Sequence, residues 1–505
     1  ASDSASPPRF RDVRLGAARR AAVCLGAATA LTTACSREPV RHGKAPAPTT
    51  VTVAFPSPDA PVDPLIYNLT STRLIRMDQA GHERPELLER WQPSADRLTW
   101  TLTLRDGVRL HDGTIATASE VARRIKDAID SGDSQPGLWT VQSAAANGPT
   151  SVVLTLREPT SLLLEGLSLV EALPAGPYRE VDEDAALPEL MAADGPPPRP
   201  DVGRVTVRRY DTPRAAVAAL LREDVDVLYE VPSDARALLS SEDSVQTFPY
   251  VKPYVVTLGL NHRHPALAKR EVRQALNAAV DRKAIVEEDA DGFGEPAADL
   301  LWREHWAVSH TADVEAMRPD RDRARRLLDE AGLRERTRTD GSVEPRLRLT
   351  CLIVDDPTMR RVAARLQRTY ASIGIALDLQ VLPLREMLPR LGTGTFDTFL
   401  TPVVTGYGLG MPYLYFADHR HPRLFSHGYT GAAAAAERVR QAATDDAFAD
   451  AARELHRVLL EDPPAVYLYW LESSRAVGPR LRVPSPVEGD VLGSLSRWTV
   501  AGAAR

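Results

Sequence analysis

Cysteine and aromatic residues are scarce in this sequence. Cysteine occurs three times in 505 residues, as Cys24, Cys35 and Cys351, and aromatic side chains make up 6% of the chain. Three cysteines cannot supply a disulfide framework for a chain of this length, so an apolar core must stabilise it. The 43% of hydrophobic residues are sufficient for such a core and exclude a disordered chain.

An excess of positive charge and long apolar runs are missing as well. Lysine and arginine total 62 against 68 acidic residues, which gives a net charge of -6 and excludes the basic footprint of a nucleic-acid-binding protein. Beyond residue 34 no apolar run approaches the roughly 18 residues of a membrane-spanning helix. At about 150 residues per domain, the length predicts two to four structural units.

Signatures of enzymes are also missing. The sequence contains no G-x-S-x-G, H-E-x-x-H or G-x-x-x-x-G-K-[ST] pattern and no paired-cysteine zinc motif. Acidic residues are plentiful, but no pair is set apart by its position. We therefore expect a protein that is not an enzyme and uses no cofactor.

Residues 1–34 are typical of an export signal. Five arginines in the first twenty residues precede Ala21–Ala34, a fourteen-residue stretch without charge that is too short to span a bilayer as a helix. Its end, Leu31–Cys35, resembles a bacterial lipobox, which implies cleavage before Cys35 and lipidation of that cysteine. A short buried helix, or twin-arginine export through Arg19-Arg20, are the alternatives. The proline-containing remainder of residues 35–50 is then a tether.

Beyond residue 50, strand and helix patterns alternate. Leu98–Leu104 alternates apolar residues with threonine, as a half-buried strand does, and Asp106-Gly107 predicts a turn into a second arm at 108–110. Thr117 followed by Glu120 predicts a helix start. Further along, strands are predicted at 254–260, 375–381 and 466–470, and helices at 272–280, 324–331, 362–373 and 446–459. This alternation predicts an α/β fold.

Several of these segments, in this order, resemble the extracellular solute-binding proteins of family 5, which are the oligopeptide-, dipeptide- and nickel-type receptors of ABC importers. The segments that carry the resemblance are Pro85–Trp91, Leu98–Val108, His111–Gly113, Thr117–Val121, Gly176–Tyr178, Asp211–Asp226, Asn261, Pro265, Val272–Leu276, Ala279, Asp281-Arg282, Ala324–Gly332, Leu366–Ile375, Phe396-Asp397 and Leu459–Leu468. Taken alone, their turns report fold rather than ligand, and we interpret Arg273 and Asp281 as an ion-pair network at a helix surface.

The resemblance implies a two-lobed α/β fold, periplasmic-binding-protein-like (type II), with mixed sheets, hinge strands and an extra subdomain in the first lobe. Lobe 1 is expected at 51–258 with the inserted subdomain at about 65–170, lobe 2 at 259–470, and a C-terminal return to lobe 1 at 471–505. The ligand would be enclosed when the lobes close.

The resemblance also points to a ligand segment after Phe396-Asp397, where family members carry an acid that pairs with the ammonium of a peptide. A gapless count puts Gly406 at that acid, and no acidic residue occurs between Asp397 and Asp418. A buried ammonium without a carboxylate costs on the order of several kcal/mol. We therefore expect a less charged or blocked ligand, unless an acid such as Asp63 or Glu295 reaches in. The predicted ligand-binding residues are Thr401, Pro402, Val403, Val404, Thr405, Gly406, Tyr407, Trp302 and Trp470.

Histidine pairs offer a different interpretation. His262 and His264, and His419 and His421, are each two residues apart, and His427 follows. Zinc and nickel sites use such ligands but normally add cysteine or carboxylates at defined spacing. We expect solvent-exposed turn histidines and no metal, and we expect Cys351 to be a small buried apolar residue rather than a nucleophile.

The resemblance thus predicts an exported lipoprotein, anchored at the outer face of the cytoplasmic membrane or in the periplasm. It would capture a small peptide or peptide-like solute, act as a monomer and deliver the solute to ABC permease subunits. A sensor or structural lipoprotein with the same fold is the alternative, and a hydrolase is a more distant one.

Overall fold

The computed structural model describes residues 49–58, 60–131, 135–182, 184–194, 199–308, 317–337, 339–340, 343–417 and 427–501. The predicted signal peptide, Cys24, Cys35 and the tether up to residue 48 lie outside these ranges, as do His419 and His421. Within the ranges, no helix combines the length and the apolar character needed to cross a bilayer.

One mixed sheet of eleven strands runs through the protein, in the order β17-β16-β18-β12-β19-β11-β1-β10-β9-β8, with β13 paired to β19. Its strands are β1 (Thr49–Phe55), β8 (Tyr178–Glu180), β9 (Glu189–Ala192), β10 (Val202–Arg209), β11 (Val227–Leu228), β12 (Gln246–Leu260), β13 (Glu295–Pro296), β16 (Leu347–Val354), β17 (Ile375–Leu382), β18 (Thr398–Val404) and β19 (Ala465–Val477). Parallel and antiparallel pairs both occur, as predicted for a mixed sheet.

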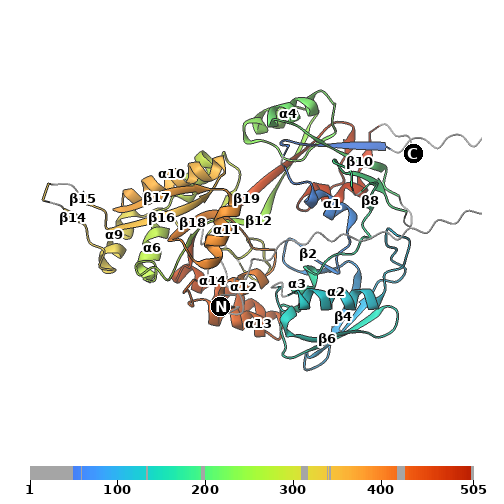
Figure 1. The fold of residues 1–505 in the computed structure, drawn as a ribbon, viewed down its shortest axis with the longest axis horizontal. Coiled ribbons are helices and arrows are strands. Elements are labelled where there is room, and N and C mark those ends of the chain that lie inside the picture. Colours follow the sequence, from blue (N-terminus) through green and yellow to red (C-terminus); the bar gives the residue numbers. More distant parts are fainter. Residues whose placement is uncertain are drawn as a thin grey trace, which may run out of the picture. The chain divides into compact units, whose positions relative to one another are not determined.

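The two longest strands, β12 and β19, belong to both halves of this sheet and lie side by side in Figure 1. Residues 246–251 of β12 pair with 472–477 of β19, and residues 255–259 pair with 465–470. The register is interrupted at 252–254. We name the part with β1 and β8–β11 the first lobe and the part with β13 and β16–β18 the second lobe. The predicted boundary between residues 258 and 259 falls within β12, past this interruption.

A separate four-stranded sheet forms the insert, which we define as residues 74–173. It has the order β4-β5-β7-β6, and its apolar side chains form their own core. Its strands are β4 (Leu88–Pro93), β5 (Thr99–Leu104), β6 (Val141–Ala146) and β7 (Ser151–Leu156), joined by the short pair β2 (Ile75–Met77) and β3 (Glu83–Pro85). Since β5 alternates buried and less buried residues, one face of this sheet packs inward, and α2 covers it.

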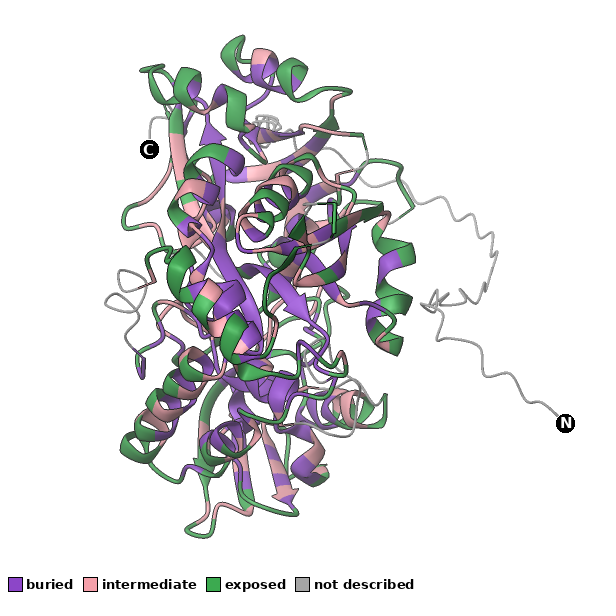
Figure 2. Cartoon of the chain, turned by 90° about the vertical axis from the view of Figure 1, so that its left-hand side faces the viewer, coloured by how far each residue is buried: buried purple, intermediate pink, exposed green. Residues whose placement is uncertain are grey.

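Helices cover the outer faces of the sheets, and Figure 2 shows buried central strands and helices with exposed outward faces. The helices are α1 (Asp63–Thr70), α2 (Ala118–Asp130), α3 (Leu163–Ser168), α4 (Pro213–Leu221), α5 (Arg236–Ser240), α6 (Arg270–Ala278), α7 (Arg282–Ala284), α9 (Arg321–Glu330), α10 (Pro357–Ala371), α11 (Leu384–Thr393), α12 (Gly410–Phe416), α13 (Ala433–Gln441) and α14 (Asp445–Glu461). The remaining short strands pair as β14 (Arg336–Thr337) with β15 (Val343–Glu344), and β20 (Leu481–Arg482) with β21 (Thr499–Val500).

Local signals in the sequence are confirmed at the ends of these helices. The side chain of Thr117 accepts a hydrogen bond from the Glu120 amide at 3.2 Å and caps α2. Gly332 and Gly374 follow α9 and α10 with φ of 80° and 86°, which glycine adopts at little steric cost. Cys351 in β16 is fully buried, and burial raises the pKa of its thiol to about 12, as expected for an apolar role.

The predicted hairpin arm at 108–110 is wrong. β5 pairs with β4 on one side and with β7 on the other, so neither of its edges is free. Residue Arg109 instead forms an isolated bridge with Ile115. A strand from another part of the insert has taken the place of the local partner.

The predicted surface network of Arg273 and Asp281 is also wrong. Arg273 is 4% exposed, and its guanidinium donates to the Pro463 carbonyl at 3.0 Å and forms an ion pair with Asp462. Asp281 caps α7 by accepting from the Ala284 amide at 3.0 Å. The two residues therefore serve different contacts, one in the core and one at a helix start.

Candidate functional site

The first part of the predicted ligand segment is a strand of the main sheet. Thr401, Pro402, Val403 and Val404 end β18 and pair with residues 254–257 of β12. Thr401 and Val403 are buried, whereas Val404 is 37% exposed. These residues extend the sheet to the place where β12 and β19 pass from one lobe to the other.

The next residues turn away from the sheet. Thr405 is fully buried, and its amide and hydroxyl both donate to the Pro253 carbonyl, at 2.8 and 2.9 Å. Pro253 lies in the interrupted stretch of β12, so this double contact fixes the segment to the lobe crossing. Gly406 follows with φ of 68°, a conformation that favours glycine.

Three predicted aromatic residues meet beside this turn. The ring of Trp302 lies edge-on to Tyr407 and to Trp470, with centroid distances of 5.0 and 5.2 Å. The Trp302 indole N–H donates to the Gln79 carbonyl of the insert at 2.6 Å. The structure therefore brings Trp302, Tyr407 and Trp470 together, whereas Thr401–Val404 serve the sheet.

A cavity of about 280 Å³ begins next to Tyr407, between the insert and the second lobe. We name it the interlobe cavity. Its lining from the insert is Met77, Gly81, His82, Glu83, Arg97, Trp100, Ser161, Leu162, Leu164 and Glu165. Its lining from the second lobe is His305, Trp306, Gly408, Leu409, Ala442, Ala443, Thr444, Asp445 and Phe448.

Two carboxylates of the insert reach the interlobe cavity. Glu165 on α3 is 7% exposed, and its Oε2 accepts from the Gly410 amide at the start of α12 at 2.7 Å. Burial, together with the nearby Glu83, raises the pKa of Glu165 to about 7. Burial also raises the pKa of Glu83 above its ordinary value. Both acids therefore lie where an ionised carboxylate is poorly solvated.

Aromatic rings form another wall of the interlobe cavity. The ring of Trp306 stacks on Phe448 with centroids 5.6 Å apart and on His82 with centroids 5.7 Å apart. His305 also stacks on Phe448, at 6.0 Å. Trp306 is 38% exposed.

No acid lies near Gly406 in the sequence, but one lies near it in the folded protein. A Cβ built on Gly406 would lie 3.9 Å from Oε1 of Glu165. The acids first considered lie elsewhere, since Asp63 is exposed at the start of α1 and Glu295 pairs with Arg303 at 2.7 Å. Sequence reasoning missed Glu165. Its only signal is a single acid within the apolar stretch 162–170.

The expectation of solvent-exposed histidines is wrong at two positions. His262 and His427 are 6% and 2% exposed, and their Nε2 atoms contact the carbonyls of Pro464 and Leu391 at 2.8 and 2.7 Å. Burial lowers the pKa of His262 to about 4 and also lowers that of His427. Across the described ranges, no three His, Cys, Asp or Glu side chains are placed to hold a metal ion.

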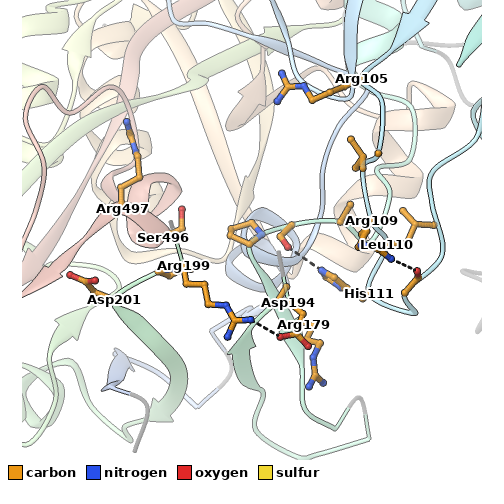
Figure 3. Close-up of a pocket in the computed structure, with 18 of the residues that line it drawn as sticks. Arg105, Arg109, Leu110, His111, Arg179, Asp194, Arg199, Asp201, Ser496 and Arg497 are labelled. Carbon is orange, nitrogen blue, oxygen red and sulfur yellow. Dashed lines mark hydrogen bonds and ion pairs between the residues drawn. The ribbon is translucent and has the colours of Figure 1, made fainter. Parts of the chain in front are cut away.

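A second hollow, of about 1280 Å³, lies away from the interlobe cavity and is lined by several arginines. Figure 3 shows Arg105, Arg109, Arg179, Arg199 and Arg497 around it. Its lining comes from residues 105–111 and 113 of the insert and from 175–177, 179, 193–194, 199–201 and 496–499 of the first lobe, and not from the second lobe. Part of its charge is already balanced, because Arg199 pairs with Asp194 at 3.6 Å. A ligand here would not contact both lobes.

Comparisons with known proteins agree with this architecture. A family model described as "Bacterial extracellular solute-binding proteins, family 5 Middle" matches residues 82–196 and 196–422. The probable D,D-dipeptide-binding periplasmic protein DdpA of Escherichia coli K12 is 23% identical over 341 residues, 62% of this chain and 63% of the relative. The glutathione-binding protein GsiB of Escherichia coli O1:K1 is 25% identical over 349 residues, 62% of this chain and 66% of the relative. The chain thus spans just under two thirds of these relatives.

Among solved structures, NikZ from Campylobacter jejuni in complex with Ni(L-His) superposes with a TM-score of 0.71. The match covers 89% of this chain and 99% of that one, at 20% sequence identity. At this identity the likeness concerns the fold. It confirms the predicted two-lobed, type II periplasmic-binding-protein architecture with mixed sheets.

Proposed function

Because the chain belongs to the bacterial extracellular solute-binding proteins of family 5, we propose that it captures a small solute between its two lobes for an ABC importer. The supporting observation is the interlobe cavity, whose lining is shared between the insert and the second lobe. A solute held there contacts both sides and therefore stabilises the closed arrangement over the open one. The solute class we propose is a peptide or a peptide-like molecule.

The contacts around the cavity suit this role. Arg97 of the insert donates to the Ala442 carbonyl of the second lobe at 2.6 Å, and the Ser161 amide donates to the Arg440 carbonyl at 2.8 Å. These bonds lie at the rim of the cavity and not at the lobe crossing. They can form and break as the lobes close and open, while β12 and β19 keep the lobes connected.

Native mass spectrometry of the gently purified protein tests solute capture. We expect a small molecule bound at one copy per chain. We expect Tyr407→Ala to retain less of it, since Tyr407 packs against Trp302 and is followed by Gly408, which lines the cavity. Tyr67→Ala, at an exposed tyrosine of α1, is the matched control and should retain the molecule. Absence of any bound molecule, together with no binding from a di- to pentapeptide library, would contradict the proposal.

We also propose that Cys35 carries a lipid anchor and that the protein hands its solute to permease subunits in the membrane. Support comes from the charged, uncharged and small-residue order of residues 1–35. One acyl chain binds membranes only marginally, whereas two or three chains anchor a protein stably. Radiolabelled palmitate should enter the wild type and not Cys35→Ser. Equal labelling of both proteins would refute the anchor, and a chain that is anchored but never stimulates uptake would favour a sensor role.

A further inference from the structure

The carboxylate of Glu165 in the insert fits closely against the backbone of the second lobe. Its Oε2 accepts a hydrogen bond from the Gly410 amide at 2.7 Å. A Cβ added to Gly408 would overlap with this carboxylate, and a Cβ added to Gly410 would overlap with the carboxylate and with the ring of Pro136. The two glycines therefore leave just enough room for the Glu165 side chain.

Two backbone hydrogen bonds join the insert and the second lobe in the same contact. The Ser161 amide of the insert donates to the Arg440 carbonyl at 2.8 Å, and the Trp306 amide of the second lobe donates to the Ala80 carbonyl of the insert at 2.9 Å. Both bonds break if the insert separates from the second lobe. The amides of Ser161 and Trp306 therefore report closure on segments other than 408–410.

Apolar side chains complete this contact around Glu165. Leu162 of the insert is 1% exposed and belongs to the core of the second lobe. Trp139 of the insert stacks on Tyr413 of α12, with ring centroids 5.2 Å apart. A carboxylate in such an interface is costly unless donors meet it on closure. The Gly410 amide is a donor in the right place, so the match between Glu165 and residues 408–410 favours the closed arrangement.

We propose that Glu165 and residues 408–410 form a latch, which stabilises the closed arrangement through contacts within the protein and acts on every solute alike. This inference rests on the proposed function and adds a positioning residue to it, since Glu165 acts on the lobes and not on the solute. A solute binds the closed arrangement. A latch that shifts the closing equilibrium therefore changes the apparent affinity for each solute by the same factor.

Hydrogen exchange of the solute-free protein tests the latch. Glu165→Ala removes the acceptor and should speed exchange at the amides of Ser161 and Trp306 by about tenfold, the factor that corresponds to the loss of a charged hydrogen bond. Glu165→Gln keeps an acceptor oxygen for the Gly410 amide and should exchange as the wild type does. Unchanged exchange at Ser161 and Trp306 in Glu165→Ala would overturn the latch, because Glu165 would then stabilise only its own surroundings.

A substitution in the second lobe tests the same contact, also if Glu165→Ala fails to fold by circular dichroism. Gly410→Ala adds a methyl group where Glu165 and Pro136 leave no room, so it should speed exchange at Ser161 and Trp306 as well. Gly392→Ala is the matched control and should leave exchange unchanged. Among the described residues, no atom beyond its chain neighbours and its own helix backbone lies within 4 Å of a Cβ added at Gly392.

Solute affinities separate the latch from a direct contact between Glu165 and the solute. Calorimetry with di- to pentapeptides and their N-acetylated copies should show that all peptides that bind the wild type bind Glu165→Ala about tenfold more weakly, by a common factor. A loss confined to one chemical class of peptide would overturn the latch. If no peptide bound the wild type and no molecule co-purified with it, the proposed function would fail, whereas exchange at Ser161 and Trp306 would still decide the latch.

Discussion

At the scale of single residues, the protein buries charged side chains in two different environments. Arg282 is 3% exposed, and its guanidinium donates to the carbonyls of Ala297 and Tyr467 at 3.0 and 2.7 Å. Burial nevertheless lowers its pKa to about 10, so it stays charged at neutral pH. Glu165 has backbone donors too, but its pKa of about 7 makes its charge depend on pH near neutrality.

The raised pKa of Glu165 predicts that this residue makes the stability of the protein depend on pH. Its pKa is about 7 in the folded protein and 4.5 in the unfolded chain, so the folded state binds more protons between these values. The free energy of unfolding should therefore fall as pH rises from 5 to 8, by about 2.5 kcal/mol from this group. Glu165→Gln should lack this fall.

Urea unfolding at pH 5 and at pH 8 measures the effect. Glu89→Gln, at an exposed position of the same insert, should keep the full dependence of the wild type. If Glu165→Gln lost as much stability as the wild type between the two pH values, the raised pKa of Glu165 would be refuted. The other acid on this cavity wall, Glu83, is unchanged in the variant and accounts for part of the remaining dependence.

At the scale of elements, one arginine joins a helix to a turn remote in sequence. Arg273 of α6 donates to the carbonyls of Leu267 and Ala268, which precede the helix, and to Pro463, which lies between α14 and β19. Its ion pair with Asp462 adds a charged contact to the same turn. The start of β19, a crossing strand, is thereby held against α6.

Arg273→Ala should lower the free energy of unfolding by about 3 to 5 kcal/mol, because it leaves Asp462 and several buried carbonyls without their donor. Arg270→Ala is the matched control on the same helix. Arg270 is exposed and donates to the Glu461 carbonyl at 2.9 Å, so its loss should cost less than about 1 kcal/mol. Equal destabilisation by the two changes, measured by urea unfolding, would contradict this assignment.

At the scale of the whole molecule, β12 and β19 connect the lobes and the interrupted register at 252–254 marks where they cross. A stretch without continuous strand pairing can change its backbone angles at lower cost than a paired one. Thr405 holds the turn before Tyr407 to Pro253 within this stretch. The proposed movement of the lobes would therefore also change the position of Tyr407, through the same few residues.

A bound solute should consequently stabilise and compact the protein. With the molecule identified by native mass spectrometry at a hundredfold excess over its Kd, the free energy of unfolding should rise by about 2.7 kcal/mol. Small-angle X-ray scattering should record a smaller radius of gyration. Tyr407→Ala at the same concentration should show smaller changes in both measurements. A tightly bound solute that left the radius of gyration unchanged would exclude the hinge motion.

Much of the element structure could be predicted from the sequence because its signals are local. The Thr117 cap, the glycines at 332 and 374 and the apolar alternation of β5 act through neighbours within a few residues. The order of such segments also predicted the family and the two-lobed fold. The arm at 108–110 failed because strand pairing is not local, and β7 occupies the edge that a hairpin would have used.

The sequence by itself determined most of the elements and, through their order, the family, whereas the tertiary structure alone decided the chemistry of the cavity. Glu165 and Gly406 are far apart in the chain, and only the packing of α3 against α12 brings them together. The burial of His262 and the partner of Arg273 were decided in the same way. The physical reason is that burial and pairing of charges depend on which surfaces meet, and no local pattern of residues encodes that meeting.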